Sequence, residues 1–180
     1  MEALAESLAG ADDAAIVLVL ADRPAEGLTR AAARGIAAHQ LADPRDGTEW
    51  LARLETAKAD LLVLAGYLRL VPAAVIAAYR DRIVNVHPSL LPKYGGRGMY
   101  GARVHAAVLA AGEAESGCTV HLVDEVYDRG APLAQARVPV LPDDSIASLA
   151  ARVLEQEHRL LPAVVRAAAH AGHVVPLSVR

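Results

Sequence analysis

The chain has 180 residues, a formal net charge of −3 and an apolar content of 54%. This length favours one domain with a substantial core, and no apolar run reaches the roughly 20 residues that span a bilayer. The acidic start lacks the basic region of a signal peptide, and a single cysteine excludes an internal disulfide framework, so the sequence predicts a cytoplasmic protein without a membrane partner. The slight negative charge argues against a nucleic-acid partner.

Apolar strands and amphipathic helices alternate along the first half of the chain. Runs of aliphatic residues predict strands that are buried on both faces, and proline or glycine marks several helix ends. The predicted elements are helices at 1–8, 24–34, 48–57 and 72–79 and strands at 15–21, 36–41, 61–65 and 83–87. This order, with its short connections, predicts an α/β fold with a doubly wound, mostly parallel sheet.

The second half of the chain has a different pattern of predicted elements. A loop rich in glycine and proline at 88–101 precedes a helix at 102–111. Strands at 118–123 and 133–140 flank a polar turn, which predicts a hairpin. Ser145 is a suitable N-cap for a long helix to about residue 171, and Pro162 predicts a break or kink within that helix.

Three polar side chains are candidates for chemistry. Asn85 and His87 are two residues apart on the predicted strand at 83–87, so they share one face. Pro88 ends the ladder and places both at the carboxyl end of the strand, where ligands bind in parallel α/β sheets. Asp128 lies in a polar turn after another predicted strand. An amide that donates to an oxyanion, an imidazole that carries protons and a carboxylate that favours the charged imidazole together suit acyl transfer.

Each candidate also has an ordinary structural interpretation. A histidine such as His87 more often packs or is exposed at a strand end, and Asp128 is of a type common in turns. Arg69 is interpreted equally well as a residue that binds a substrate carboxylate and as an ordinary surface residue. The side chain of His121 faces either a site or solvent. The seven histidines and the single cysteine show no metal-ligand spacing, and no dinucleotide or Walker loop is present, so no metal site is predicted.

Several motifs together resemble the formyltransferase family that uses 10-formyltetrahydrofolate. They are Asn-Val-His-Pro-Ser-Leu-Leu-Pro at 85–92, Leu-Ala-Gly-Tyr-Leu-Arg-Leu at 64–70 and Asp-Arg-Gly at 128–130. Val-His-Leu-Val at 120–123 and Gln-Glu-His at 156–158 narrow the likeness to the glycinamide ribonucleotide (phosphoribosylglycinamide) branch and its deformylase relative. The likeness extends to about residue 175 and implies a Rossmann-like formyltransferase fold with a C-terminal hairpin and a long terminal helix.

The resemblance also implies an activity. Catalytic Asn85, His87 and Asp128 would transfer the formyl group of 10-formyltetrahydrofolate to the amine of glycinamide ribonucleotide in de novo purine synthesis, without a metal. Implied contacts place folate at Leu68, Arg69, Leu70, Val71, Asn85, Val123 and Asp124, and the ribonucleotide at Glu2 and Glu157. The alternatives are a formyltetrahydrofolate deformylase and a folate-binding module without turnover. A homodimer is compatible with the resemblance.

One departure from the family concerns the start of the chain. Family members begin with a strand and a Gly-Ser-Asn loop that holds the substrate phosphate at a helix N-terminus. Residues 1–4 match those that follow this loop, so the resemblance implies one domain at 1–180 that is truncated at its N-terminus. The first strand of such a sheet lies between the strands that here occupy 15–21 and 61–65. We therefore expect these two strands to pair directly, to recruit a strand from another copy, or to fold poorly.

Overall fold

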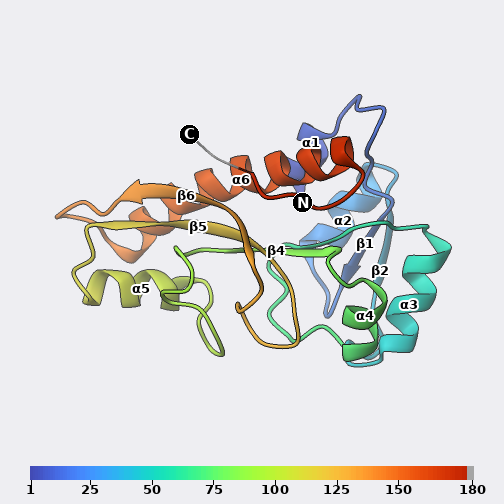
Figure 1. Ribbon diagram of the computed structural model, residues 1–180, viewed down its shortest axis with the longest axis horizontal. Coiled ribbons are helices and arrows are strands. Elements are labelled where there is room, and N and C mark those ends of the chain that lie inside the picture. The colour runs from blue at the N-terminus through green and yellow to red at the C-terminus, as the bar shows by residue number, and fades with distance from the viewer. Residues whose placement is uncertain (178–180) are drawn as a thin grey trace.

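The computed structural model describes residues 1–177, and these residues form a mixed α/β fold (Figure 1). The helices are α1 (Glu2–Ser7), α2 (Glu26–Ala33), α3 (Gly47–Thr56), α4 (Ala73–Ala78), α5 (Ala102–Ala110) and α6 (Ile146–Ala171). The strands are β1 (Leu18–Ala21), β2 (Ala37–Gln40), β3 (Leu62–Leu64), β4 (Ile83–His87), β5 (Glu115–Leu122) and β6 (Pro132–Pro139). The predicted order and type of the elements are confirmed, and the largest differences are a later start of β1 and an earlier start of β5.

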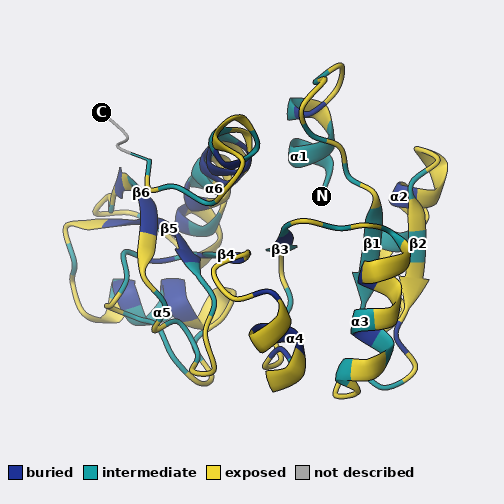
Figure 2. Ribbon diagram, turned by 45° about the vertical axis from the view of Figure 1, so that its right-hand side comes forward, coloured by how far each residue is buried: buried dark blue, intermediate teal, exposed yellow. Residues whose placement is uncertain are grey.

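The strands form two sheets, where the sequence predicted one continuous sheet. β1 and β2 pair in parallel, and the second sheet has the order β3-β4-β5-β6. In that sheet β3 and β4 are parallel, whereas β5 and β6 are antiparallel to their neighbours. Within residues 1–177 no ladder joins β1 to β3, so of the three expected outcomes the direct pairing of these strands does not occur (Figure 2).

Side chains bridge the junction between the two sheets. Leu18 and Leu20 of β1 pack against a buried cluster that contains Leu62 and Leu64 of β3. This side-chain packing joins the two sheets where no backbone ladder does. β1 and β3 each keep one edge without a strand partner in the described part of the chain, so the single predicted sheet is divided.

Two aliphatic cores stabilise these layers. One lies between α6, α5 and the β5–β6 hairpin, and the other lies among α3, α4 and β3 (Figure 2). Trp50 and Tyr79 are the aromatic members of the second cluster, while the first is built from Val, Leu, Ala and Cys side chains. The core of this chain, which has no phenylalanine, is thus built mainly from aliphatic side chains.

The long helix α6 has clear signals at both ends. Ser145 is its N-cap, as predicted: its Oγ accepts the N–H of Ser148, and Ser148 Oγ accepts the N–H of Ser145. Gly172 ends the helix in the left-handed conformation with φ of +73°. The helix continues through Pro162, so of the predicted break or kink the break is wrong, and the kink stays a prediction. Pro162 is buried in the core, and this burial offsets the backbone hydrogen bond that proline cannot make.

Candidate active site

Asn85 and His87 lie on the same face at the carboxyl end of β4, as predicted. β4 has β3 on one side and β5 on the other, so its position is fixed by two ladders. Pro88 follows directly and has no N–H with which to extend the sheet. His87 is almost fully buried and Asn85 is partly buried. The sheet therefore fixes both side chains in a place where little of them is exposed to solvent.

The turn between β5 and β6 brings Asp128 to this site. Its Oδ1 lies 3.5 Å from Nδ1 of His87 and 3.6 Å from Nε2 of His121. Its Oδ2 accepts the backbone N–H of Gly96 at 2.8 Å. Asp128 has a φ of +55°, a left-handed conformation that Asp tolerates better than most residues. The three predicted side chains are thus close together, and His121 joins them.

His121 orients the amide of Asn85. Register places these two residues opposite each other on β5 and β4, and Asn85 Nδ2 lies 3.0 Å from His121 Nε2. The other ring nitrogen, Nδ1, lies 2.7 Å from the carbonyl oxygen of Leu122. A carbonyl only accepts, so Nδ1 carries the proton and Nε2 accepts from the Asn85 amide. The second N–H of that amide remains available to a ligand.

Burial keeps His121 neutral. Its side chain is 3% exposed, and this desolvation lowers the pKa of His121 more strongly than the Leu122 carbonyl and the Asp128 carboxylate raise it. The nearby His87 also lowers this pKa. A neutral His121 is required for the arrangement described above, because a doubly protonated ring has no lone pair to accept the Asn85 N–H.

The two nitrogens of His87 have different environments. Nε2 lies 2.8 Å from the backbone carbonyl oxygen of Tyr94, so it donates its proton there. Nδ1 faces Asp128 at 3.5 Å, which is too long for a strong hydrogen bond. Nδ1 is therefore the nitrogen that can serve a reacting group, and the carboxylate of Asp128 lies beside it.

Gly95 allows the loop after β4 to approach Asp128. A Cβ atom at position 95 would lie 2.5 Å from Leu91 Cδ2 and 3.1 Å from Asp128 Cβ. A side chain at this position would require Leu91 to move and would crowd Asp128. The next residue, Gly96, then supplies the N–H that holds Asp128. The glycines at 95 and 96, to which the sequence assigned no role, thus shape the site.

The predicted folate segment after β3 has a mixed environment. Leu68 and Leu70 are 42% and 47% exposed, whereas Val71 is buried in the second core cluster. Arg69 Nε donates to Asp22 Oδ2 at 2.9 Å. The Arg69 side chain is 55% exposed, so its terminal nitrogens face a region that solvent reaches. Leu68, Arg69 and Leu70 are accessible to a ligand, and Val71 supports them from the core.

The second predicted folate segment leads into the Asp128 turn. The N–H of Val123 donates to the carbonyl of Ile83 at 2.9 Å, which ties this segment to β4. Asp124 Oδ1 accepts the N–H of Val126 at 2.8 Å, and Val126 is exposed. Asp124 thus shapes the turn through its own backbone contact, as short polar side chains do.

The two predicted ribonucleotide contacts differ in environment. Glu2 forms an ion pair with Arg34, and this hydrogen bond lowers the pKa of Glu2. Glu157 lies on α6, where burial raises the pKa of its carboxyl to about 7. The same carboxyl contributes to the raised pKa of the buried Cys118 thiol, after the larger effect of burial. Glu157 is therefore a perturbed acid, of the kind often found in functional sites.

Similarity to known proteins identifies the family of this chain. A family model described as formyl transferase matches residues 2–165. The chain belongs to the formyl transferase family. It is 51% identical over 124 residues to the chloroplastic phosphoribosylglycinamide formyltransferase of Vigna unguiculata, an alignment that covers 69% of this chain and 39% of that protein. This formyl transferase chain therefore spans about two fifths of the length of that relative.

Solved structures give the same assignment of the fold. The phosphoribosylglycinamide formyltransferase of Anaplasma phagocytophilum matches with a TM-score of 0.86 and 32% identity, over 94% of this chain and 81% of that one. The enzyme of Brucella melitensis matches with a TM-score of 0.83 and 44% identity, over 98% and 92% of the two chains. The predicted α/β formyltransferase fold is confirmed by both.

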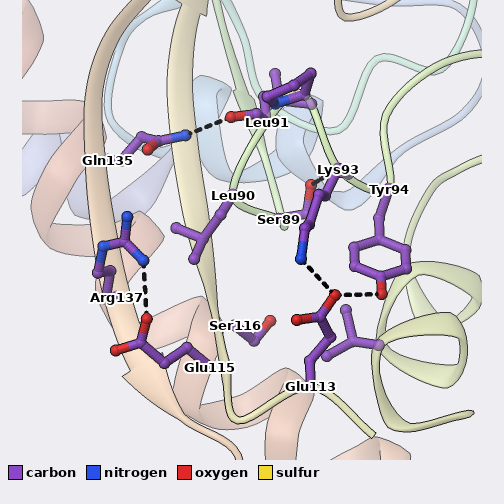
Figure 3. A pocket seen from close by; sticks show the side chains of 12 residues that line it. Ser89, Leu90, Leu91, Lys93, Tyr94, Glu113, Glu115, Ser116, Gln135 and Arg137 are labelled. Atoms are coloured by element: carbon purple, nitrogen blue, oxygen red, sulfur yellow. Dashed lines mark hydrogen bonds and ion pairs between the residues drawn. The ribbon is translucent and has the colours of Figure 1, made fainter. Parts of the chain in front are cut away.

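A cavity of about 270 Å³ lies beside the site of this formyl transferase chain (Figure 3). It is lined by the loop after β4 and by the start of the β5–β6 hairpin, with Lys93, Glu113, Gln135 and Arg137 among its polar side chains. Asn85, His87 and Asp128 do not line it. Tyr94 belongs to both regions, because it lines the cavity and its carbonyl oxygen lies 2.8 Å from His87 Nε2.

Neither a cluster of metal-ligating side chains nor a membrane-spanning helix is found in the described residues. In residues 1–177, no group of three or more His, Cys, Asp and Glu side chains could hold a metal ion. None of the helices within that range has the length and apolar character needed to cross a bilayer.

Proposed function

We propose that this chain transfers the formyl group of 10-formyltetrahydrofolate to the amine of glycinamide ribonucleotide. The observation that supports this most directly is the site in which Asn85, His87 and Asp128 meet at the end of β4. The family match and the relatives named phosphoribosylglycinamide formyltransferase favour the same substrates.

In the proposed reaction the substrate amine attacks the formyl carbon, and the formyl oxygen becomes a tetrahedral oxyanion. The free N–H of Asn85 and the Nδ1–H of protonated His87 donate to this oxygen. Asp128 stabilises the charged imidazole through its carboxylate, 3.5 Å from Nδ1. When the bond from carbon to the folate nitrogen breaks, that nitrogen gains a proton and the attacking nitrogen loses one. His87 is placed to assist this exchange.

Binding of the two substrates uses separate parts of the chain in this proposal. Folate lies against Leu68, Arg69 and Leu70 and against the turn that begins at Val123 and Asp124. Only Nε of Arg69 bonds to Asp22 among the described contacts, so a terminal nitrogen is free for a carboxylate of the folate tail. Val71 and Asn85 complete this side of the site.

The ribonucleotide contacts of the proposal are Glu157 and Glu2. Glu157 accepts hydrogen bonds from the ribose when its carboxyl is ionised. Since its pKa is raised to about 7, this contact strengthens as the pH rises through neutrality. Glu2 lies in the first turn of α1 and already pairs with Arg34. In this proposal the ribonucleotide therefore contacts Glu2 while the Glu2–Arg34 ion pair stays in place.

One assay separates this function from the alternatives. The purified chain is incubated with 10-formyltetrahydrofolate in the presence and absence of glycinamide ribonucleotide, and formylated ribonucleotide and free formate are both measured. Formyl product that depends on the ribonucleotide supports the proposal. Formate released at the same rate without it indicates a deformylase, and folate binding by calorimetry without either product indicates a binding module.

Location and assembly are further parts of the proposal. We propose a single formyltransferase domain that acts in the cytoplasm and assembles as a homodimer. Sedimentation equilibrium over a range of protein concentrations measures the assembly directly, and a constant monomer mass throughout that range contradicts the dimer.

A further inference from the structure

Glu113 connects two residues of the loop that follows β4. It lies between α5 and β5, and its Oε1 accepts hydrogen bonds from Lys93 Nζ at 2.7 Å and from the Tyr94 hydroxyl at 2.9 Å (Figure 3). The Glu113 side chain is 26% exposed, whereas that of Lys93 is 64% exposed. Glu113 belongs neither to the predicted catalytic residues nor to the predicted substrate contacts. Its partly buried side chain and its two hydrogen-bond partners therefore need another explanation.

Tyr94 is held in an unusual backbone conformation. Its φ is +56°, in the left-handed region that residues with a Cβ atom rarely occupy. Such a conformation persists only when surrounding contacts determine it. The Tyr94 hydroxyl bond to Glu113 is a contact of this kind, because it fixes the far end of the side chain while the backbone turns.

The same residue holds the candidate catalytic imidazole. The carbonyl oxygen of Tyr94 accepts the Nε2–H of His87 at 2.8 Å. Two residues later, the N–H of Gly96 donates to Asp128 Oδ2 at 2.8 Å. The segment from Tyr94 to Gly96 therefore contacts both His87 and Asp128. It bonds to His87 Nε2 and Asp128 Oδ2, whereas His87 Nδ1 and Asp128 Oδ1 face each other.

We infer that Glu113 is a positioning residue for the site: through Tyr94 it holds His87 in the tautomer and orientation in which Nδ1 faces Asp128. The tautomer follows from the acceptor, since a carbonyl at Nε2 requires the proton on that nitrogen and leaves Nδ1 toward the carboxylate. Loss of the Glu113–Tyr94 bond releases the Tyr94 carbonyl, and His87 then loses the contact that distinguishes its two nitrogens.

A purely structural role for Glu113 makes a different prediction. The Lys93–Glu113 ion pair is largely exposed on its lysine side, and pairs of this kind contribute little to stability. If the ion pair were the whole role of Glu113, its loss would leave the ratio of the two His87 tautomers unchanged. This tautomer ratio therefore distinguishes a positioning role of Glu113 from a purely stabilising one.

The chain offers a matched control on the wall of the same cavity. Glu115 pairs with Arg137 at 2.8 Å, so it resembles Glu113 in charge, neighbourhood and type of partner (Figure 3). Glu115 makes no hydrogen bond to the Tyr94 segment among the described contacts. The variant Glu115→Ala thus removes a comparable ion pair without the proposed connection to His87.

The experiment is nitrogen-15 NMR of the histidine rings at pH 8, with the His87 signals identified by their loss in His87→Gln. The parent and Glu115→Ala are expected to show His87 protonated on Nε2. In Glu113→Ala and in Tyr94→Phe, the ratio of the two tautomers is expected to change about fivefold toward Nδ1, as the loss of one hydrogen bond allows. Tyr94→Phe removes only a hydroxyl, so it keeps the test valid if Glu113→Ala does not fold.

Unchanged tautomer ratios in Tyr94→Phe overturn the inference, whatever the ratio in Glu113→Ala. The turnover readout rests on the proposed function: kcat for formyl transfer is expected to fall about tenfold in Tyr94→Phe, with the KM for folate unchanged. A tautomer change in a protein that forms no formyl product in any variant leaves the positioning role standing and rejects the proposed function instead.

Discussion

The amide nitrogen of Asn85 lies 3.0 Å from Nε2 of His121, and the antiparallel register of β4 and β5 places these two residues opposite each other. The pair is therefore set by the sheet itself and not by a mobile loop. His121 accepts one amide hydrogen and leaves the other for a ligand, so the sheet register determines where an oxyanion would find its donor.

The first prediction concerns the candidate catalytic pair. His87→Ala and Asp128→Asn are expected to lower kcat for formyl transfer by about 10²–10³, the usual effect of losing a group that stabilises a developing charge. Steady-state kinetics with both substrates measures this, and circular dichroism establishes that each variant is folded. Near-parental turnover in either folded variant contradicts the assignment of that residue.

The second prediction concerns Arg69. Arg69→Ala is expected to raise the KM for 10-formyltetrahydrofolate about tenfold while kcat changes little, because a contact to the folate tail is equally strong in the ground state and the transition state. Arg45→Ala is the matched control, since Arg45 is an exposed arginine that pairs with an aspartate, Asp43. Equal KM values in the two variants assign Arg69 to the surface.

The third prediction concerns Glu157. Because burial raises its pKa from 4.5 to about 7, the folded protein keeps a proton that the unfolded chain loses between these values. This group therefore lowers the free energy of unfolding as the pH rises from 4.5 to 7. Glu157→Gln is expected to be more stable than the parent by up to about 3 kcal/mol at pH 8, and equally stable near pH 4. Urea unfolding at both pH values measures the difference, and a constant difference would falsify the prediction.

The fourth prediction concerns His105. Its side chain is buried, and its Nδ1 has no hydrogen-bond partner among the described residues. Burial, with a smaller effect of His87, lowers the pKa of His105 below 6.5. The unfolded chain then binds more protons between the lowered pKa and 6.5, so stability is lost as the pH falls below 6.5.

His105→Gln is accordingly expected to lose less stability than the parent between pH 7.5 and pH 5.5. His158→Gln is the control, because His158 is exposed on α6 and its replacement should leave the slope as it is in the parent. Thermal melts at the two pH values give both slopes. Parallel slopes for His105→Gln and the parent would show that His105 does not contribute to the acid sensitivity.

Local patterns in the sequence predicted most of the fold. The alternation of apolar strands and helices gave the order of the elements, and β4 has the predicted bounds, Ile83–His87, because a proline follows it. Ser145 was predictable because capping depends on residues a few positions apart. The continuity of α6 through Pro162 was not, since it depends on how well the ring packs in the core.

The site was predictable only in part. Strand ends and a polar turn were enough to select the candidates Asn85, His87 and Asp128, and the structure brings these side chains together. His121 could have been found from the antiparallel register, because a hairpin places it opposite Asn85. The contributions of Tyr94, Gly95 and Gly96 depend on backbone groups of an irregular loop, for which residue types alone give no direction.

The division of the β-sheet has a consequence for amide hydrogen exchange. Within residues 1–177 no ladder joins β1 and β2 to the other four strands, so this pair can open as a unit while β4 and β5 remain closed. Opening of that kind parts side chains of the second core cluster and the Arg69–Asp22 ion pair, without breaking a ladder between strands. Backbone amides at 18–21 and 37–40 should therefore exchange with solvent earlier than those at 83–87, as a separate unit of low local stability.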